Sequence, residues 1–166
     1  IDQVFINDKN NNITINSEEI IYDNKKQVIS SIKVNDQTII NDKNNNIIIK
    51  ADEIIYDNKK QIISSTGNTF AKIKNEYEIK STELIHDRNL MEIYSTTKTE
   101  LKDKLGNILQ FEEFKFNINK DLLKAKKISF FDNKNNKIYL DNAIINLNTY
   151  EFIGKNVSMD FDNSLF

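Results

Sequence analysis

The residues that could do chemistry lie in short stretches rich in acids and amides, and two of these stretches have the spacing of a calcium-binding loop. They are Asp8, Asn10, Asn12 and Glu19, and Asp42, Asn44, Asn46 and Glu53. Such a loop takes oxygen ligands from positions 1, 3, 5 and 12 and needs Gly at position 6 for its sharp turn. Here position 6 is Ile13 or Ile47, which begins an alternating apolar run that carries the Glu away from the Asp. The pattern therefore favours a turn between strands, and we expect neither a metal nor another cofactor.

Acid–base and nucleophilic chemistry also has little support in the sequence. His86 is the only histidine and the chain has no cysteine, so neither a thiolate nor a Ser-His-Asp arrangement is indicated. His86 takes a place that tyrosine holds in the other copies of an internal repeat, which favours a buried or groove-lining imidazole. Glu19, Glu53 and Glu83 recur in register, and the repeat explains their recurrence without catalysis. We therefore expect a protein that is not an enzyme.

Composition limits the classes of partner. The chain has 166 residues, which predicts a single domain over residues 1–166, and its formal net charge is −2. Lysines and acids are interspersed, so the sequence shows no clustered cationic face of the kind that nucleic acid requires, and we expect no nucleic-acid partner.

The repeat determines the fold class. Ile6–Ser31 and Ile40–Ser65 are near copies, offset by 34 residues with five mismatches, and Glu76–Asp87 is a third, more divergent copy. Apolar residues within each copy recur every second position, which is the signature of β-strands. Clusters of Asn, Asp and Lys between the runs are typical of turns. The sequence predicts an all-β, antiparallel fold built from two-strand repeats of about 30 residues.

The alternation slips by one residue at the same place in every copy. Ile47 and Ile49 share a face, but Ile54 and Tyr56 lie an odd number of residues further on, so one residue must be absorbed at "KADE". A β-bulge or a corner absorbs such a residue and bends the strand. We therefore expect bent, stacked strands and not a flat sheet.

The apolar face of these strands is the remaining candidate site. The residues projected inward are Ile13, Ile15, Ile20, Tyr22, Ile47, Ile49, Ile54, Tyr56, Ile62, Tyr77, Ile79, Leu84, Phe116 and Leu140. The pattern fits either the ordinary core of a packed β fold or an elongated apolar groove, which suits acyl chains.

The phrases "IIIKADEIIYDNKKQIISSTGNTFAKI" and "EIKSTELIHDRNLMEIYST" resemble the OstA-like domain of periplasmic lipopolysaccharide (LPS) transport proteins. The shared features are a strand ending in Ala-Asp, a hydrophobic-x-Tyr-Asp turn, and a returning strand that ends in Thr66, Gly67 and Asn68. The segment Gly154–Phe166 is similar to the one that precedes the outer-membrane barrel in LPS-assembly proteins of the LptD family.

This resemblance implies a bent β-jellyroll with an open apolar groove, at the periplasmic face of the outer membrane of a Gram-negative bacterium. The residues projected inward would line the groove and bind LPS acyl chains. The domain would receive LPS from a periplasmic bridge protein of the same fold, joined by edge-strand pairing. It would then pass the LPS to its own C-terminal barrel, with that barrel's plug lipoprotein, and this barrel would begin where the present chain stops.

One departure from the family and two alternatives bear on this expectation. Cysteines lock this domain to the barrel in well-known relatives, whereas this chain has none, so another contact would have to fix the orientation. The first alternative is a free-standing periplasmic LPS bridge protein. The second is a ligand-free β-solenoid scaffold or adhesin with a filled core.

The sequence generates one prediction about assembly. We expect the first strands, Ile1–Ile15, to dock edge to edge with a bridge-type jellyroll, because an open sheet edge offers unpaired backbone groups. Deleting this segment should abolish capture of the bridge protein in a pull-down assay, and unchanged capture would refute the prediction.

Overall fold

The computed structural model describes residues 3–132 and 136–160. Ile1 and Asp2 of the predicted docking segment, and residues 161–166 of the segment predicted to precede a barrel, lie outside the described residues. No helix within the described ranges is long and apolar enough to cross a membrane.

The described residues form seventeen strands in one antiparallel sheet, which confirms the predicted all-β class. The strands are β1 (Val4–Asp8), β2 (Ile13–Ser17), β3 (Glu19–Asp23), β4 (Val28–Ile32), β5 (Thr38–Asp42), β6 (Ile47–Ala51), β7 (Glu53–Asp57), β8 (Ile62–Ile73), β9 (Tyr77–Asp87), β10 (Glu92–Ser95), β11 (Thr99–Asp103), β12 (Ile108–Phe111), β13 (Glu113–Asn117), β14 (Leu122–Phe131), β15 (Lys137–Asn146), β16 (Phe152–Lys155) and β17 (Ser158–Asp160).

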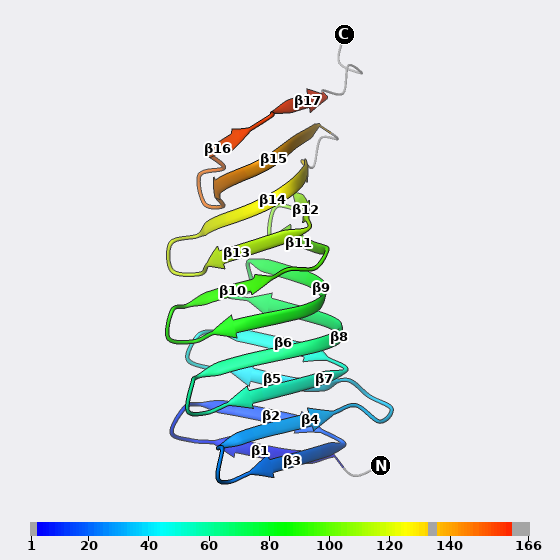
Figure 1. Cartoon of the computed structure of the whole chain (residues 1–166), viewed down its shortest axis with the longest axis vertical. Helices are drawn as coiled ribbons and strands as arrows, with labels where there is room; N and C mark the ends of the chain where they lie inside the picture. The colour runs from blue at the N-terminus through cyan, green and yellow to red at the C-terminus, as the bar shows by residue number, and fades with distance from the viewer. Residues whose placement is uncertain (1–2, 133–135, 161–166) are drawn as a thin grey trace.

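The sheet is folded into two walls whose strands stack along the long axis, from the N-terminal to the C-terminal end (Figure 1). The first wall contains β1, β2, β5, β6, the end of β8, the start of β9, β11, β12, the end of β14, the start of β15, and β17. The second wall contains β3, β4, β7, the start of β8, the end of β9, β10, β13, the start of β14, the end of β15, and β16. We call the edge where the chain passes between the walls the corner, and the opposite edge, where the hairpin turns of both walls lie, the seam.

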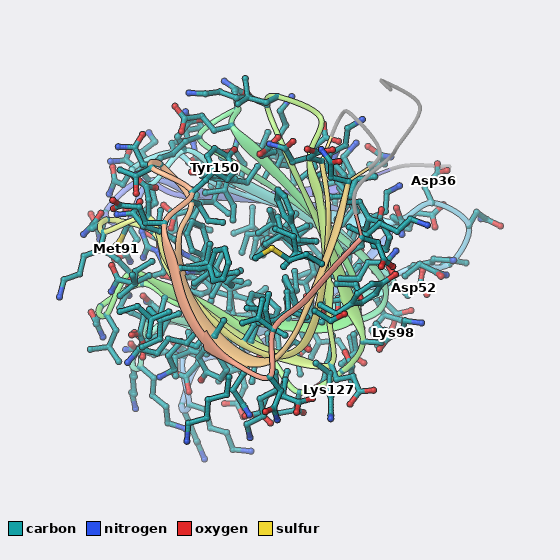
Figure 2. All side chains as sticks on the ribbon, turned by 90° about the horizontal axis from the view of Figure 1, so that it is seen from above. Asp36, Asp52, Met91, Lys98, Lys127 and Tyr150 are labelled. Atoms are coloured by element: carbon teal, nitrogen blue, oxygen red, sulfur yellow. The ribbon has the colours of Figure 1, made fainter. Side chains whose placement is uncertain are left out.

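The predicted bend is confirmed at the corner. Asp52 separates β6 from β7 within "KADE", and the pairing of β8 with β9 shifts register between Thr66 and Thr69. In the later copy, Lys127 adopts a positive φ of 52° where β14 turns. Figure 2, which looks down the stack, places Asp52 and Lys127 on the corner side, and Met91 in a hairpin turn on the opposite side.

The Asn-rich stretches form capped turns at the seam. The Asp8 carboxylate accepts hydrogen bonds from the backbone N–H groups of Asn10 (3.0 Å) and Asn11 (3.2 Å). The turn closes at Asn12 in a left-handed conformation, with φ of 53°. Asn tolerates this conformation, and an Asp side chain stabilises such turns. The turn predicted at "DKNNN" is therefore confirmed.

Two edge strands lie at the N-terminal end of the described residues, β1 in the first wall and β3 in the second, and only β1 belongs to the predicted docking segment. Among the described residues, β1 pairs only with β2, whereas β2 pairs on both sides and its Ile13 is fully buried. Residues 3–15 therefore combine one edge strand with the start of an interior strand, and within this range β1 is the strand with an unpaired edge.

The corner geometry makes a prediction about Gly67. Its φ is +79°, and an added Cβ would lie 2.4 Å from an Asp52 carboxylate oxygen. Lys33 Nζ (2.8 Å) and the backbone N–H of Asn68 (3.0 Å) hold this carboxylate in place. Gly67→Ala should therefore destabilise the protein both through backbone strain and through this clash.

Gly106→Ala is the matched control, because Gly106 has a φ of +88° and open space around its Cα. Its cost should be the left-handed strain alone, about 1–2 kcal/mol, whereas Gly67→Ala should cost a further ~1–3 kcal/mol from overpacking. Urea unfolding measures both differences, and equal costs would show that Asp52 does not constrain the corner.

Candidate functional site

The space between the walls is lined by two long rows of inward side chains, which we call the apolar interior. In the first wall, successive register partners form the row Ile6, Ile15, Ile40, Ile49, Ala71, Ile79, Leu101, Leu109, Phe130, Ile138 and Met159. The second wall contributes Tyr22, Ile29, Tyr56, Ile63, His86, Ile93, Phe116, Leu123, Ile145 and Phe152. The row of the first wall is apolar from its first strand to its last, and the row of the second wall is apolar except at His86.

Most residues that the sequence projected inward do lie between the walls. Those that are buried are Ile13, Ile15, Ile47, Ile49, Ile54, Tyr56, Tyr77, Ile79, Leu84, Phe116 and Leu140. Ile20 is half-buried and packs against this core. In this structure their own packing fills the middle of the interior.

Two projected residues differ from expectation. Ile62 is half-buried on the outer side, and its neighbour Ile63 (1% exposed) takes the inward position. Ile62 pairs directly with Asp57, which faces outward, across the hairpin. In the returning strand the inward-facing positions therefore begin one residue later than the sequence projection placed them. Tyr22 does belong to the inward row, but β3 is an edge strand, and Tyr22 is therefore 54% exposed.

The apolar interior is accessible at its ends. Tyr22 at the N-terminal end and Met159 at the C-terminal end are 54% and 44% exposed, whereas residues midway, such as Ile79, are fully buried. A cavity of about 60 Å³ lies near the C-terminal end, and its lining is Phe130, Ile138, Leu140, Ile145, Tyr150 and Phe152. An apolar ligand would meet exposed apolar side chains first at these two ends.

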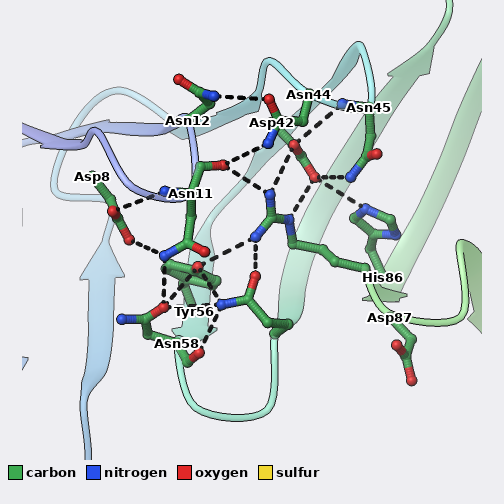
Figure 3. Close-up of polar contacts among 12 residues, drawn as sticks. Asp8, Asn11, Asn12, Asp42, Asn44, Asn45, Tyr56, Asn58, His86 and Asp87 are labelled. Atoms are coloured by element: carbon green, nitrogen blue, oxygen red, sulfur yellow. Dashed lines mark hydrogen bonds and ion pairs between the residues drawn. The ribbon is translucent and has the colours of Figure 1, made fainter.

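Polar contacts between the walls close the seam. Near the N-terminal end, Asn11 of the first wall donates to the Asn58 side chain of the second wall (2.9 Å), as Figure 3 shows. Further along, Lys74 Nζ donates to the carbonyl oxygen of Ile118 (2.9 Å). Towards the C-terminal end, the Tyr150 hydroxyl donates to the Asp103 carboxylate.

A buried ionic group also joins the two walls at this seam. Asp42 of the first wall accepts hydrogen bonds from Arg88 Nε (2.7 Å) and Asn45 Nδ2 (2.6 Å), and His86 Nε2 lies 3.4 Å from the same carboxylate. The Asp42 and Arg88 side chains are 1% and 7% exposed. Arg88 also donates to Tyr56, to Gln61 and to the Asn11 carbonyl, so it joins turns from both walls (Figure 3).

The electrostatics of this group favour its ionised form. Burial alone would raise the pKa of Asp42, but hydrogen bonds from His86, Arg88 and Asn45 outweigh it and hold the pKa well below its usual value. The expected buried imidazole is confirmed, since His86 is 0% exposed. Sequence reasoning missed its partners, although there was a signal: in the third copy, His86 and Arg88 replace Tyr56 and Asn58 together.

The glutamates that recur in register lie outside the interior. Glu53 and Glu83 are both register partners of Thr66, one on each side, and so belong to strands separated by β8. Their carboxylates accept hydrogen bonds from Thr66 and Thr96. Within residues 3–132 and 136–160, no group of three or more His, Cys, Asp or Glu side chains is placed to hold a metal ion.

The Asp42 group predicts a particular pH dependence of stability. Because its folded-state pKa lies below the unfolded value, Asp42 stabilises the fold above about pH 4 and loses this contribution as the pH falls further. Asp42→Asn should lower the free energy of unfolding by about 3 kcal/mol at pH 7, since it leaves Arg88 buried without its counter-charge.

Urea unfolding between pH 7 and pH 3 measures this effect. The wild-type and Asp42→Asn curves should converge as the pH falls. Asp36→Asn, a change at an exposed loop carboxylate, is the control and should alter the free energy of unfolding at pH 7 by no more than about 0.5 kcal/mol. A difference between wild type and Asp42→Asn that stays constant with pH would contradict the assignment.

Comparison with known proteins supports the fold. No model of a known protein family matches the chain, and no curated protein matches it in sequence. The crystal structure of LptH, described as the LptA homologous periplasmic component of the conserved lipopolysaccharide transport device from Pseudomonas aeruginosa, is similar with a TM-score of 0.63 and 8% identity. The match covers 95% of this chain and 99% of that chain. At this identity the likeness establishes the fold, and the predicted β-jellyroll is confirmed.

Proposed function

We propose that this protein binds the acyl chains of LPS in its apolar interior and passes LPS from a periplasmic bridge protein to an outer-membrane barrel. The observation that carries the proposal is the continuous row of apolar side chains in the first wall, from Ile6 to Met159. Burying an acyl chain gains about 0.8 kcal/mol per CH₂ group. A row that spans the whole stack lines one continuous apolar path for transfer between its two ends.

Transfer of this kind makes and breaks no covalent bond, so the proposed role is not enzymatic. LptH is described as a periplasmic component of an LPS transport device, and the shared fold supports a periplasmic location for this chain as well. The unpaired edge of β1 and the last strands, β16 and β17, supply surfaces at the two ends where partners of the same fold would add strands.

The placement before a barrel is the finer part of the proposal and rests on the resemblance of Gly154–Phe166 to LptD. A free-standing bridge protein is the second candidate, and the likeness in fold to LptH, described as a periplasmic component of a transport device, favours it. A barrel-coding region downstream in the same reading frame would exclude this candidate, and a stop codon would support it.

Photo-crosslinking tests the binding of LPS. p-Benzoylphenylalanine at Tyr56 or Phe116, both fully buried in the apolar interior, should give adducts with LPS in cells. Tyr139 is the matched aromatic control, because it is 37% exposed and lies on the outer side of β15.

Adducts from the interior positions and none from Tyr139 would support the proposal. If Tyr56 and Phe116 give no adducts while circular dichroism shows both variants folded, the interior is a filled core and the protein is a ligand-free scaffold. Equal adducts from all three positions would also contradict the proposal.

A further inference from the structure

The outer side of the second wall carries its own long row of register partners. From the N-terminal to the C-terminal end the row consists of Ile21, Ser30, Ile55, Ser64, Ile85, Tyr94, Lys115, Lys124, Ile144 and Ile153. These residues alternate along each strand with the residues of the inward row, so their side chains lie on the opposite face of the sheet from the apolar interior. The C-terminal half of the row contains lysine among the apolar residues, and the structure is hollowed there.

This hollow, which we call the outer groove, has a volume of about 800 Å³ and crosses β10, β13, β14, β15 and β16. Its floor includes Ala125, Ala143 and Gly154, which are register partners. The two alanines are buried and Gly154 has no side chain, so no bulky side chain fills the floor of the groove at these three positions. The volume lies within the usual range for a small-molecule site, about 300–1,000 Å³.

Positive charge gathers along this groove. Four lysines line it, Lys115, Lys124, Lys126 and Lys155, with Glu113 as the one acid in the lining, whereas the whole chain has a net charge of −2. Lys126 pairs with Glu113 (2.8 Å), and Lys115 pairs with Glu92 (3.0 Å). Within residues 3–132 and 136–160, Lys124 and Lys155 have no carboxylate partner within 4.0 Å.

The register adds a second argument for an anionic ligand. Lys115 and Lys124 are direct cross-strand partners, an arrangement in which like charges destabilise a sheet. Lys115 Nζ also lies over the ring of Tyr94, 5.5 Å from its centroid. Lys115 has Glu92 as its carboxylate partner, so the charge that a ligand would balance is that of Lys124. A phosphate beside the Lys124 ammonium group would relieve the repulsion within this cross-strand pair and bind through charge-assisted hydrogen bonds.

Apolar side chains continue the same row beyond the lysines. Ile144 and Ile153 are 41% and 80% exposed, and Ile153 is the most exposed large apolar side chain among the described residues. Exposed apolar residues next to cations match a ligand that has an anionic head and an alkyl chain.

We propose that the outer groove binds one anionic amphiphile, with its phosphate head at Lys124 and its alkyl chain along Ile144 and Ile153. The site lies on the face of the second wall opposite to the apolar interior, and it does not depend on the function proposed for that interior.

Tyr94→Trp creates a reporter for this site, because Tyr94 lines the groove and the chain has no tryptophan. The probe is dodecyl phosphate carrying a terminal bromine, titrated below its micelle concentration. Bromine quenches indole fluorescence on contact, so we expect saturable quenching. The control is Tyr139→Trp on the outer side of the first wall, where we expect no saturable quenching.

Lys124→Glu in the Tyr94→Trp background tests the role of the charges. We expect binding of the probe to weaken by about tenfold or more, since one charge-assisted contact is replaced by repulsion. The urea midpoint should stay equal or rise, because the change removes a like-charge pair. This result separates lost binding from lost folding. Lys102→Glu on the outer side of the first wall should leave binding unchanged.

Three results would overturn the proposal. Undiminished quenching in Lys124→Glu would place the probe elsewhere, for example in the apolar interior. Equal binding of uncharged bromododecyl maltoside would show that the charge of the phosphate head does not contribute to binding. Displacement of the probe by inorganic phosphate at the same concentration would remove the argument from the alkyl chain.

Discussion

The whole architecture depends on one constraint: neither wall can bury its inward side chains alone, so the two walls must close on each other. A strand pair has one apolar face, and in this chain that face is covered by the opposite wall of the same folded sheet. The bend at Asp52 and its counterparts brings the walls together at the corner.

At the seam, where the turns carry polar side chains, the buried Asp42–Arg88 pair joins the two walls. A buried pair of this kind is costly to break and adds little net stability compared with apolar packing. The pair joins the end of β5 in the first wall to the turn after β9 in the second wall.

This closure bears on how an acyl chain would be accommodated under the proposed function. The middle of the interior is filled, so an entering chain must replace contacts that Ile79 and its neighbours already make with each other. Exchanging one set of apolar contacts for another changes the free energy far less than transfer from water does. Such a path holds a chain without trapping it, which suits passage better than storage. Exchange would begin at the exposed end residues, Tyr22 and Met159, because they have free apolar surface before any ligand arrives.

The sequence carries the local features of this fold because they follow from short-range chemistry. Period-two runs predict the strands, Asp and Asn predict the turns, and the slip at "KADE" predicts the bend. The error at Ile62 has a local cause as well. Hairpin pairing decides which residue of the returning strand faces inward, and the sequence projection across the turn placed that position at Ile62, one residue before Ile63. The exposure of Tyr22 and the pairing of Asp42 with Arg88 could not be predicted in this way. The first depends on the absence of a next strand, and the second joins residues 46 positions apart on facing walls.

The outer groove shows the same limit for charge. Along the chain, lysines and acids alternate so evenly that no cationic patch is evident in the sequence. The hairpin between β13 and β14 places Lys115 beside Lys124, and the following hairpins extend that row through Ile144 to Ile153. Strand pairing thus brings residues that are mixed along the sequence into separate surfaces. Lysines and apolar residues lie on the outer side of the second wall, and the buried Phe116, Leu123 and Ile145 lie on its inner side.

Because side chains alternate strictly across a strand, both surfaces depend on a single register. A slip of one residue in β14 would bring lysine into the apolar interior, so the packing of the inner row fixes the position of the outer lysines.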